Sequence, residues 1–179
     1  MRITAGKFRS RTLSVPDIDG LRPTSSRVRE ALFNILGDVE GWRMLDLFSG
    51  SGIMALEALS RGAEHAISIE QDRNACRHLY SLSEKFHVEK RWTVQQALLP
   101  KALRGIQGQH FDWIFADPPY HVGIAEQIPL WLQQASITAT TLVIEESVRA
   151  KPQWPQGWHV SSRRYGDTNL HFLQQELTL

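Results

Sequence analysis

The chain has 179 residues, 42% of them apolar, with one cysteine and a formal net charge of +1. This length predicts one globular domain with a substantial core, and a single cysteine excludes an internal disulfide. There is no apolar stretch of about 18 residues, no signal-like amino terminus and no Cys/His cluster at ligand spacing. We therefore expect a cytoplasmic protein with no membrane span and no structural metal.

The small net charge hides an asymmetry along the chain. Residues 1–29 contain seven basic and two acidic residues, a net charge of +5, and the remainder carries −4. A basic segment on a mildly acidic body is typical of proteins that contact nucleic acid. A solvated basic surface has the same composition, so charge alone leaves both interpretations open.

The first 37 residues are expected to form a basic extension. In residues 2–15, apolar residues alternate loosely with basic and polar ones, which predicts a short hairpin. A loop runs to Pro23, and Thr24, Ser25 or Ser26 can cap a helix that ends at Gly37. We accordingly expect residues 1–37 to be an extension that packs on a main domain of residues 38–179, together one compact unit.

After residue 41, strands alternate with helices. Strands are expected at residues 42–48, 63–69, 91–94, 111–116 and 140–145, with helices at 52–61, 72–85, 97–106 and 124–134. Two further strands, 158–165 and 169–177, flank a Gly-Asp turn and predict a terminal hairpin. This order predicts an α/β fold: a mostly parallel sheet covered on both faces, with an antiparallel hairpin at its edge.

A glycine-rich loop follows the first of these strands and opens a helix. Gly50 and Gly52 leave bare backbone for a ligand, and the free N–H groups of the helix favour an anionic group. With Ala55 they fit the pattern Gly-x-Gly-x-x-Gly/Ala. Glu70 ends the second strand, where a carboxylate can accept both hydroxyls of a ribose. These features fit NAD and S-adenosylmethionine equally well.

Asp46 helps to separate the two cofactors. An acid at the strand end would repel a pyrophosphate but would bind the ammonium of an amino acid. S-adenosylmethionine carries such an ammonium, together with a carboxylate for the helix amides and a ribose for Glu70. The simpler alternatives are a helix cap for Asp46 and a solvated strand end for Glu70.

The segment Asp117-Pro118-Pro119-Tyr120 follows the buried strand at 111–116. The prolines fix φ, remove two backbone donors and end the strand. The Asp117 carboxylate and the Pro118 carbonyl are then two acceptors beside the Tyr120 ring. This set suits a planar group that carries an NH2, such as a nucleobase or a carboxamide, although Pro-Pro also marks an ordinary turn.

Taken together, these segments closely resemble the RsmD family of bacterial 16S ribosomal RNA guanine-N2 methyltransferases. The resemblance is carried by Arg22-Pro23-Thr24 and by residues 27–34, 46–52, 56–62, 117–120 and 164–168, so it covers nearly the whole chain. It implies a Rossmann-like class I methyltransferase fold with a seven-stranded sheet. It also implies methyl transfer from S-adenosylmethionine to the N2 amine of a guanine in 16S rRNA, within an assembled small subunit.

The resemblance and the charge pattern together assign the site. The expected catalytic residues are Asp117, Pro118 and Tyr120. The expected cofactor residues are Asp46, Phe48, Gly50, Gly52, Glu70, Gln96 and Ala97. The expected RNA contacts are Arg9, Arg11, Arg22, Thr24, Arg27 and Pro119. One departure concerns Gln96, which stands where the family commonly has a polar, often acidic, residue that meets the adenine amino group.

We expect a monomer that needs no metal. Three other functions remain open at this point. The chain can be a different amino methyltransferase that acts on DNA adenine or cytosine or on a protein glutamine, although no room remains for a DNA-reading domain. It can be an NAD-dependent oxidoreductase, which would leave the segment 117–120 unexplained. It can also be an RNA-binding module with an inactive pocket.

Overall fold

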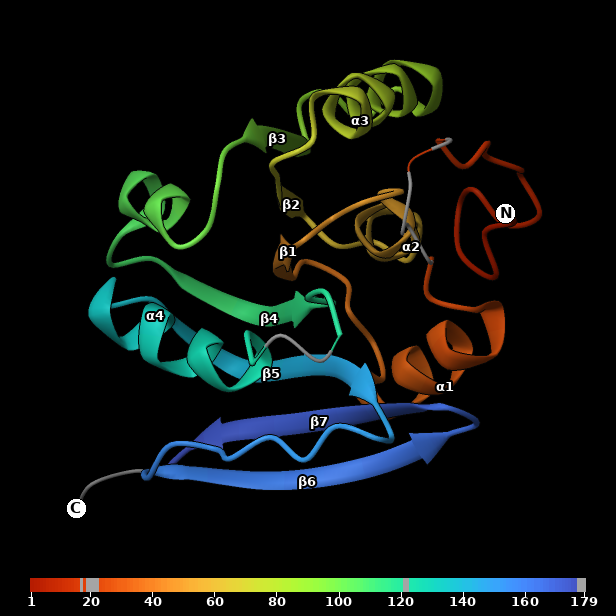
Figure 1. The fold of residues 1–179 in the computed structure, drawn as a ribbon. Helices are drawn as coiled ribbons and strands as arrows, with labels where there is room; N and C mark the ends of the chain where they lie inside the picture. The colour runs from red at the N-terminus through yellow and green to blue at the C-terminus, as the bar shows by residue number, and fades with distance from the viewer. Residues whose placement is uncertain (17, 19–22, 121–122, 177–179) are drawn as a thin grey trace. The chain divides into compact units, whose positions relative to one another are not determined.

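The computed structural model describes residues 1–16, 18, 23–120 and 123–176. The chain divides into two compact units, residues 1–98 and residues 99–179. Figure 1 shows the elements of both units along the chain.

The first unit contains three parallel strands and three helices. Its elements are α1 (Ser26–Leu36), β1 (Arg43–Leu47), α2 (Ile53–Ser60), β2 (His65–Glu70), α3 (Arg73–Phe86) and β3 (Trp92–Gln96). The strands lie in the order β3-β2-β1. Ser25 caps α1, since its hydroxyl accepts the Val28 N–H at 3.3 Å, and Gly37 ends the helix. The capping residue is thus one of the three that the sequence allowed.

Helix α2 is the centre of this unit. All eight of its residues are buried, six of them apolar and two, Glu57 and Ser60, polar. Strands β1 and β2 are buried along nearly their whole length, which is typical of parallel strands covered on both faces. The N-terminal segment lies beside α2 (Figure 1), and the N–H of Lys7 donates to the Ser60 carbonyl at 2.7 Å.

The expected hairpin at residues 2–15 is wrong in its detail. In place of two strands, the segment has one isolated antiparallel bridge between Arg2 and Thr12, with turns between them. Its apolar residues Ile3, Phe8 and Leu13 are buried as the alternation suggested. Their burial and the hydrogen bonds to α2 hold the segment, so a regular ladder is not needed.

The second unit contains four strands and short helices. Its elements are η1 (Lys101–Ile106), β4 (His110–Ala116), η2 (Ala125–Gln127), α4 (Ile128–Gln134), β5 (Thr138–Ser147), β6 (Trp158–Tyr165) and β7 (Thr168–Gln175). Strands β4 and β5 are parallel, whereas β7 is antiparallel to both β5 and β6. The chain therefore has the predicted seven-stranded, mostly parallel sheet with a C-terminal antiparallel hairpin.

Two expected helices are shorter than the sequence pattern suggested. The helix expected at residues 97–106 is only a 3-10 helix from Lys101. Pro100 has no N–H to donate and disfavours a helical conformation at Leu99, so the helix cannot extend back to residue 97. The helix expected at 124–134 begins as the 3-10 turn η2 and becomes α-helical only at Ile128. Leu177, the expected end of the last strand, lies outside the described residues.

In the described part of the chain, no helix is both long enough and apolar enough to cross a membrane. The same residues contain no group of three or more His, Cys, Asp or Glu side chains that could hold a metal ion. Cys76 is buried on α3.

Candidate functional site

The carboxyl ends of β1, β2 and β3 bring most of the predicted cofactor residues to one edge of the first unit. Strand register pairs Glu70 directly with Gln96. The Ser49 N–H donates to the Ile69 carbonyl at 3.1 Å, which places the start of the glycine loop against the end of β2. Ligands of open α/β sheets bind at this edge, because the carboxyl ends of parallel strands meet there.

Glu70 connects the two loops at this edge. One of its carboxylate oxygens accepts the Gly50 N–H at 2.9 Å, and the other accepts the Asp72 N–H at 2.8 Å. The alternative of a merely solvated strand end is therefore wrong. A carboxylate has about four acceptor positions, so Glu70 can hold both loops and still accept hydrogen bonds from a ligand.

Asp46 is a buried acid with an unused oxygen. The residue is 1% exposed, and its Oδ2 has no hydrogen-bond partner among the described residues. Burial raises the pKa of Asp46 to about 8; a hydrogen bond from Ser49 opposes the shift, and the charge of Glu70 adds to it. Helix α2 is capped by Gly52 without a side-chain hydrogen bond, so Asp46 is not its cap. An unsatisfied buried polar atom is costly, which favours a functional role.

Gly50 and Gly52, the two glycines of the loop, are required for different structural reasons. Gly52 has φ +73°, and a Cβ there would lie 2.4 Å from Cδ2 of Leu79 and 2.9 Å from the Trp92 ring. Close packing inside the unit, rather than a ligand, therefore demands glycine at this position. Gly50 also has positive φ, and so does Phe48, at 63°. A non-glycine residue in this region is strained, and such strain is concentrated at binding sites.

Gln96 and Ala97 complete this edge. Gln96 is the exposed last residue of β3, and the Ala97 N–H donates to the Glu70 carbonyl at 2.9 Å. The Gln96 side chain thus stands on the strand next to Glu70, where an amide can contact a base.

The segment Asp117–Tyr120 belongs to the second unit and follows the end of β4. Pro118 is buried, Pro119 is exposed, and Asp117 and Tyr120 are partly buried. The Tyr120 hydroxyl donates to Oε1 of Glu145 at 3.2 Å. Burial, and then the charges of Asp117 and Glu145, raise the pKa of Tyr120 well above its usual range. The tyrosine is therefore neutral and its ring is held in place.

Sequence reasoning missed Glu145 as the partner of Tyr120. Glu145 is 4% exposed and lies near the end of β5. The available signal was an acidic residue directly after the apolar run of a buried strand. Glu146, its neighbour, is also buried, and its carboxylate accepts the Ser147 N–H at 2.7 Å.

The residues predicted to contact RNA are spread over the first unit. Arg9 and Thr24 line a pocket of about 680 Å³ between the N-terminal segment and the start of α1. Arg27 is exposed on α1. The Arg11 guanidinium lies 4.1 Å from the Phe86 ring centroid and donates to the Lys85 carbonyl at 3.2 Å. Arg22 lies outside the described residues, and Pro119 is exposed in the second unit.

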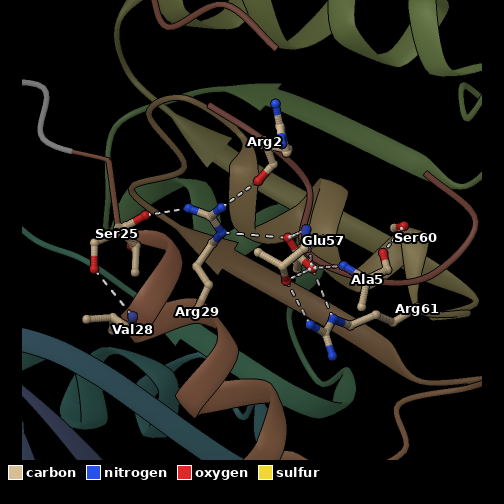
Figure 2. Close-up of polar contacts among 10 residues, drawn as sticks. Arg2, Ala5, Ser25, Val28, Arg29, Glu57, Ser60 and Arg61 are labelled. Carbon is tan, nitrogen blue, oxygen red and sulfur yellow. Dashed lines mark hydrogen bonds and ion pairs between the residues drawn. The ribbon is translucent and has the colours of Figure 1, made fainter. Parts of the chain in front are cut away.

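Arg29 is the main correction to the basic surface that the charge pattern suggested. The residue is only 1% exposed, and burial lowers its pKa. Its guanidinium donates to the carbonyls of Thr24 and Arg2, both at 2.7 Å, and its Nε lies 3.6 Å from Oε2 of Glu57 (Figure 2). Arg29 therefore holds the segment together and does not face solvent.

Glu57 is the centre of this buried cluster. The side chain is fully buried on α2, and its carboxylate accepts N–H groups of Thr4 and Ala5 and pairs with Arg61 at 3.1 Å (Figure 2). The sequence signal was a lone acid within an otherwise apolar helix. A buried carboxylate requires partners, but the sequence does not say which.

Comparisons with known proteins agree with this architecture. The family model described as "Conserved hypothetical protein 95" matches residues 1–174. Ribosomal RNA small subunit methyltransferase D of Escherichia coli K12 is 35% identical over 179 residues, which cover 98% of this chain and 89% of that protein. The Haemophilus influenzae protein of the same name is 35% identical over 163 residues, or 88% of this chain and 84% of that protein. The solved structure of the Escherichia coli protein yhhF is 33% identical, covers 99% of both chains and has a TM-score of 0.85.

Proposed function

The chain belongs to the Conserved hypothetical protein 95 family, and on this premise we propose that it is an S-adenosylmethionine-dependent rRNA methyltransferase that modifies the N2 amine of a guanine in 16S rRNA. Its relatives are named as methyltransferases of small-subunit ribosomal RNA. The observation within this chain that carries the cofactor part of the proposal is the buried Asp46 carboxylate, whose Oδ2 has no hydrogen-bond partner among the described residues, beside a glycine loop that is hydrogen-bonded to Glu70.

The residues at the edge of β1, β2 and β3 fit this cofactor. Oδ2 of Asp46, which has no partner in the described part of the chain, can accept a hydrogen bond from the ammonium of an amino acid. The Glu70 carboxylate can accept hydrogen bonds from the ribose hydroxyls, and the Gln96 amide oxygen can accept one from the adenine amino group. A dinucleotide fits less well, because its pyrophosphate would approach the Asp46 carboxylate at the end of β1. S-adenosylmethionine supplies an electrophilic methyl group on a sulfonium.

The proposed role of Asp117 and Pro118 follows from the chemistry of guanine. The lone pair of N2 is delocalised into the ring, so the amine is a poor nucleophile. Hydrogen bonds from the NH2 to the Asp117 carboxylate and the Pro118 carbonyl favour a pyramidal nitrogen, whose lone pair is then free to attack. This stabilises the transition state more than the ground state. Positioning the amine at attack distance contributes up to roughly 7–11 kcal/mol in ideal cases.

Tyr120 is proposed to stack on the guanine. Its hydroxyl is hydrogen-bonded to Glu145, which fixes the ring without making the phenol reactive. The base has to leave its stack to reach such a pocket, as it does in other enzymes that modify bases. Asp117 need not be a strong base, because the methylated nitrogen loses its proton readily.

The basic N-terminal segment is proposed to bind RNA phosphates. Phosphate contacts position a nucleic acid without reading its sequence, so specificity then comes from the shape of a folded RNA or RNA–protein particle. We propose the assembled small subunit as the substrate and a cytoplasmic monomer as the enzyme. Comparing methylation of assembled subunits with that of free 16S rRNA tests the first point, and light scattering tests the second.

The proposed function is tested by incubating the protein with labelled S-adenosylmethionine and unmodified small subunits, free 16S rRNA, tRNA or DNA. We expect label in 16S rRNA, and digestion should identify N2-methylguanosine. Label in DNA, tRNA or protein would instead favour another amino methyltransferase. Calorimetry with NAD and with S-adenosylmethionine tests the remaining enzyme alternative. Binding of NAD without binding of S-adenosylmethionine would indicate an oxidoreductase.

Asp117→Ala tests the catalytic assignment. We expect methyl transfer to fall by at least about 10²–10³-fold, the usual cost of removing a group that stabilises the transition state. Cofactor affinity should stay within a few-fold. Asp117→Asn keeps one acceptor oxygen and should retain part of the activity. A parallel collapse of cofactor binding in Asp117→Ala would contradict the assignment.

A further inference from the structure

The first unit contains a cavity whose lining residues are not those of the cofactor edge. It has a volume of about 680 Å³ and lies between the N-terminal segment and the start of α1. This volume falls within the range of small-molecule sites, about 300–1,000 Å³. Among the described residues, none of the predicted cofactor residues lines it. The cavity is therefore large enough for a nucleotide and distinct from the site proposed above.

Part of the cavity lining consists of cationic and hydroxyl groups that suit an anion, beside apolar residues such as Ile3 and Val15. Arg2 and Arg9 contribute cationic side chains from the N-terminal segment, and both residues are exposed. Ser10 and Ser26 add hydroxyl donors, and Glu30 is the one acidic residue among the described lining residues. Arginine binds phosphate well because its planar fork can donate two parallel hydrogen bonds.

Buried contacts hold the cavity in shape. Arg29, 1% exposed, lines it and joins its two walls, because its guanidinium donates both to the Arg2 carbonyl on one side and to the Thr24 carbonyl on the other (Figure 2). Glu57 pairs with both Arg29 and Arg61. Two cations thus share one carboxylate, which leaves the buried cluster with a formal charge of +1.

We propose that this cavity is an RNA subsite that takes one phosphodiester and its ribose, with Arg2 and Arg9 as the phosphate-binding residues. Arg29 and Glu57 are positioning residues that hold the two walls at the right separation. This inference rests on the proposed function, since RNA is the polyanion that the enzyme acts on. Lys7 and Arg11 on the same segment and Arg27 on α1 are also exposed, so further cations lie outside the cavity for a polymer to contact.

The test measures the affinity of the full chain for 16S rRNA by filter binding, together with methylation kinetics. We expect Arg2→Glu and Arg9→Glu each to weaken RNA binding at least tenfold and to raise KM for RNA. The kcat at saturating RNA and the Kd for S-adenosylmethionine should stay within a few-fold. Lys90→Glu is the matched control, because Lys90 is exposed in the same unit outside the basic segment. It should leave both RNA affinity and KM nearly unchanged.

Three outcomes would overturn the subsite. The first is that Arg2→Glu and Arg9→Glu leave RNA affinity unchanged. The second is that Lys90→Glu lowers RNA affinity by as much as they do, which would show a general effect of charge. The third comes from titration with inorganic phosphate. If Arg9→Glu abolishes phosphate binding but leaves RNA affinity unchanged, the cavity is a site for a small anion and not for RNA. If the unaltered protein methylates no RNA at all, the proposed function fails instead, so the two failures are distinguishable.

Glu57→Gln tests the positioning role. The substitution keeps the size of the side chain but removes the charge that Arg29 and Arg61 share. We expect KM for RNA to rise while cofactor Kd stays within a few-fold. Thr4→Val supplies a second variant that leaves every charge in place and removes the hydroxyl that donates to Glu57 at 2.5 Å. Loss of thermal stability in both variants without any change in KM for RNA would show that the cluster is only structural.

Discussion

At the scale of single residues, burial of the Asp46 carboxyl changes its pKa, and this change bears on ligand binding. Its pKa is raised to about 8, mainly by burial. The folded state therefore holds this proton more tightly than the unfolded state does. Protonated Asp46 stabilises the fold at low pH, and this contribution is lost as the pH rises from the unfolded pKa, near 4, through 8. An ammonium bound at Oδ2 would reverse the preference, because it favours the carboxylate.

Cofactor affinity should therefore depend on pH. Below pH 8, binding has to remove a proton from Asp46, so affinity is expected to rise by up to about tenfold per pH unit and to level off above pH 8. Asp46→Asn should bind S-adenosylmethionine more weakly and show little of this dependence. Calorimetry between pH 6 and 9 in buffers of different ionisation enthalpy measures both the affinity and the released proton. A flat profile for the unaltered protein would contradict the role given to Asp46.

At the scale of elements, the N-terminal segment and α2 pack at very short range. A Cβ on Gly6 would lie 1.9 Å from the Ser60 carbonyl oxygen, and Gly6 has φ +78°. Ser60 in turn accepts the Phe8 N–H at 2.9 Å and donates to the Ala5 carbonyl at 2.6 Å. Glycine at position 6 is thus what lets this segment approach the backbone at the end of α2.

Gly6→Ala should detach the segment from α2. We expect it to cost more than the ~1–2 kcal/mol that a left-handed conformation alone costs an alanine, and to speed hydrogen exchange at the amide of Lys7. Gly41→Ala is the control, because Gly41, in the same unit, has φ +75° but a Cβ at that position would meet nothing within 4 Å. Denaturant unfolding and hydrogen exchange measure the two effects. If both variants lose the same free energy of unfolding and hydrogen exchange at Lys7 is unchanged, the close contact between Gly6 and Ser60 is unimportant.

At the scale of the whole molecule, charge is divided along the chain. The net charge of +1 combines +5 in residues 1–29 with −4 in the rest. The effective basic surface is smaller than this count suggests, because Arg29 is buried against Glu57. Arg27, exposed on α1, is the cleanest position at which to test RNA binding by charge.

RNA affinity should fall as salt concentration rises, and Arg27→Glu should flatten this dependence. Loss of one phosphate contact reduces the slope of log K against log salt by about 1. The reduction should be similar for different RNA sequences, because a phosphate contact reads none. Binding measured between 50 and 300 mM salt, roughly the range over which such slopes are resolved, gives the comparison. An unchanged slope would remove Arg27 from the interface.

Much of the architecture and of the cofactor edge follows from the sequence alone. The alternation of strands and helices predicted the parallel strands and the terminal hairpin, because hydrophobic periodicity and turn residues are local signals. The same pattern placed Asp46, Glu70 and Gln96 near one another, since parallel strands direct their carboxyl ends to one edge. Local signals failed where proline interrupted a helical pattern, as at Pro100.

Only the tertiary structure decided which charged residues are inside. Arg29 and Glu57 are 28 residues apart in the sequence, and no periodicity indicates that they pair. The same holds for Tyr120 with Glu145, and for the N-terminal segment, whose hydrogen bonds go to α2 in place of a hairpin partner. The physical reason is that burying a charge is tolerated only with a partner, and long-range packing alone supplies that partner.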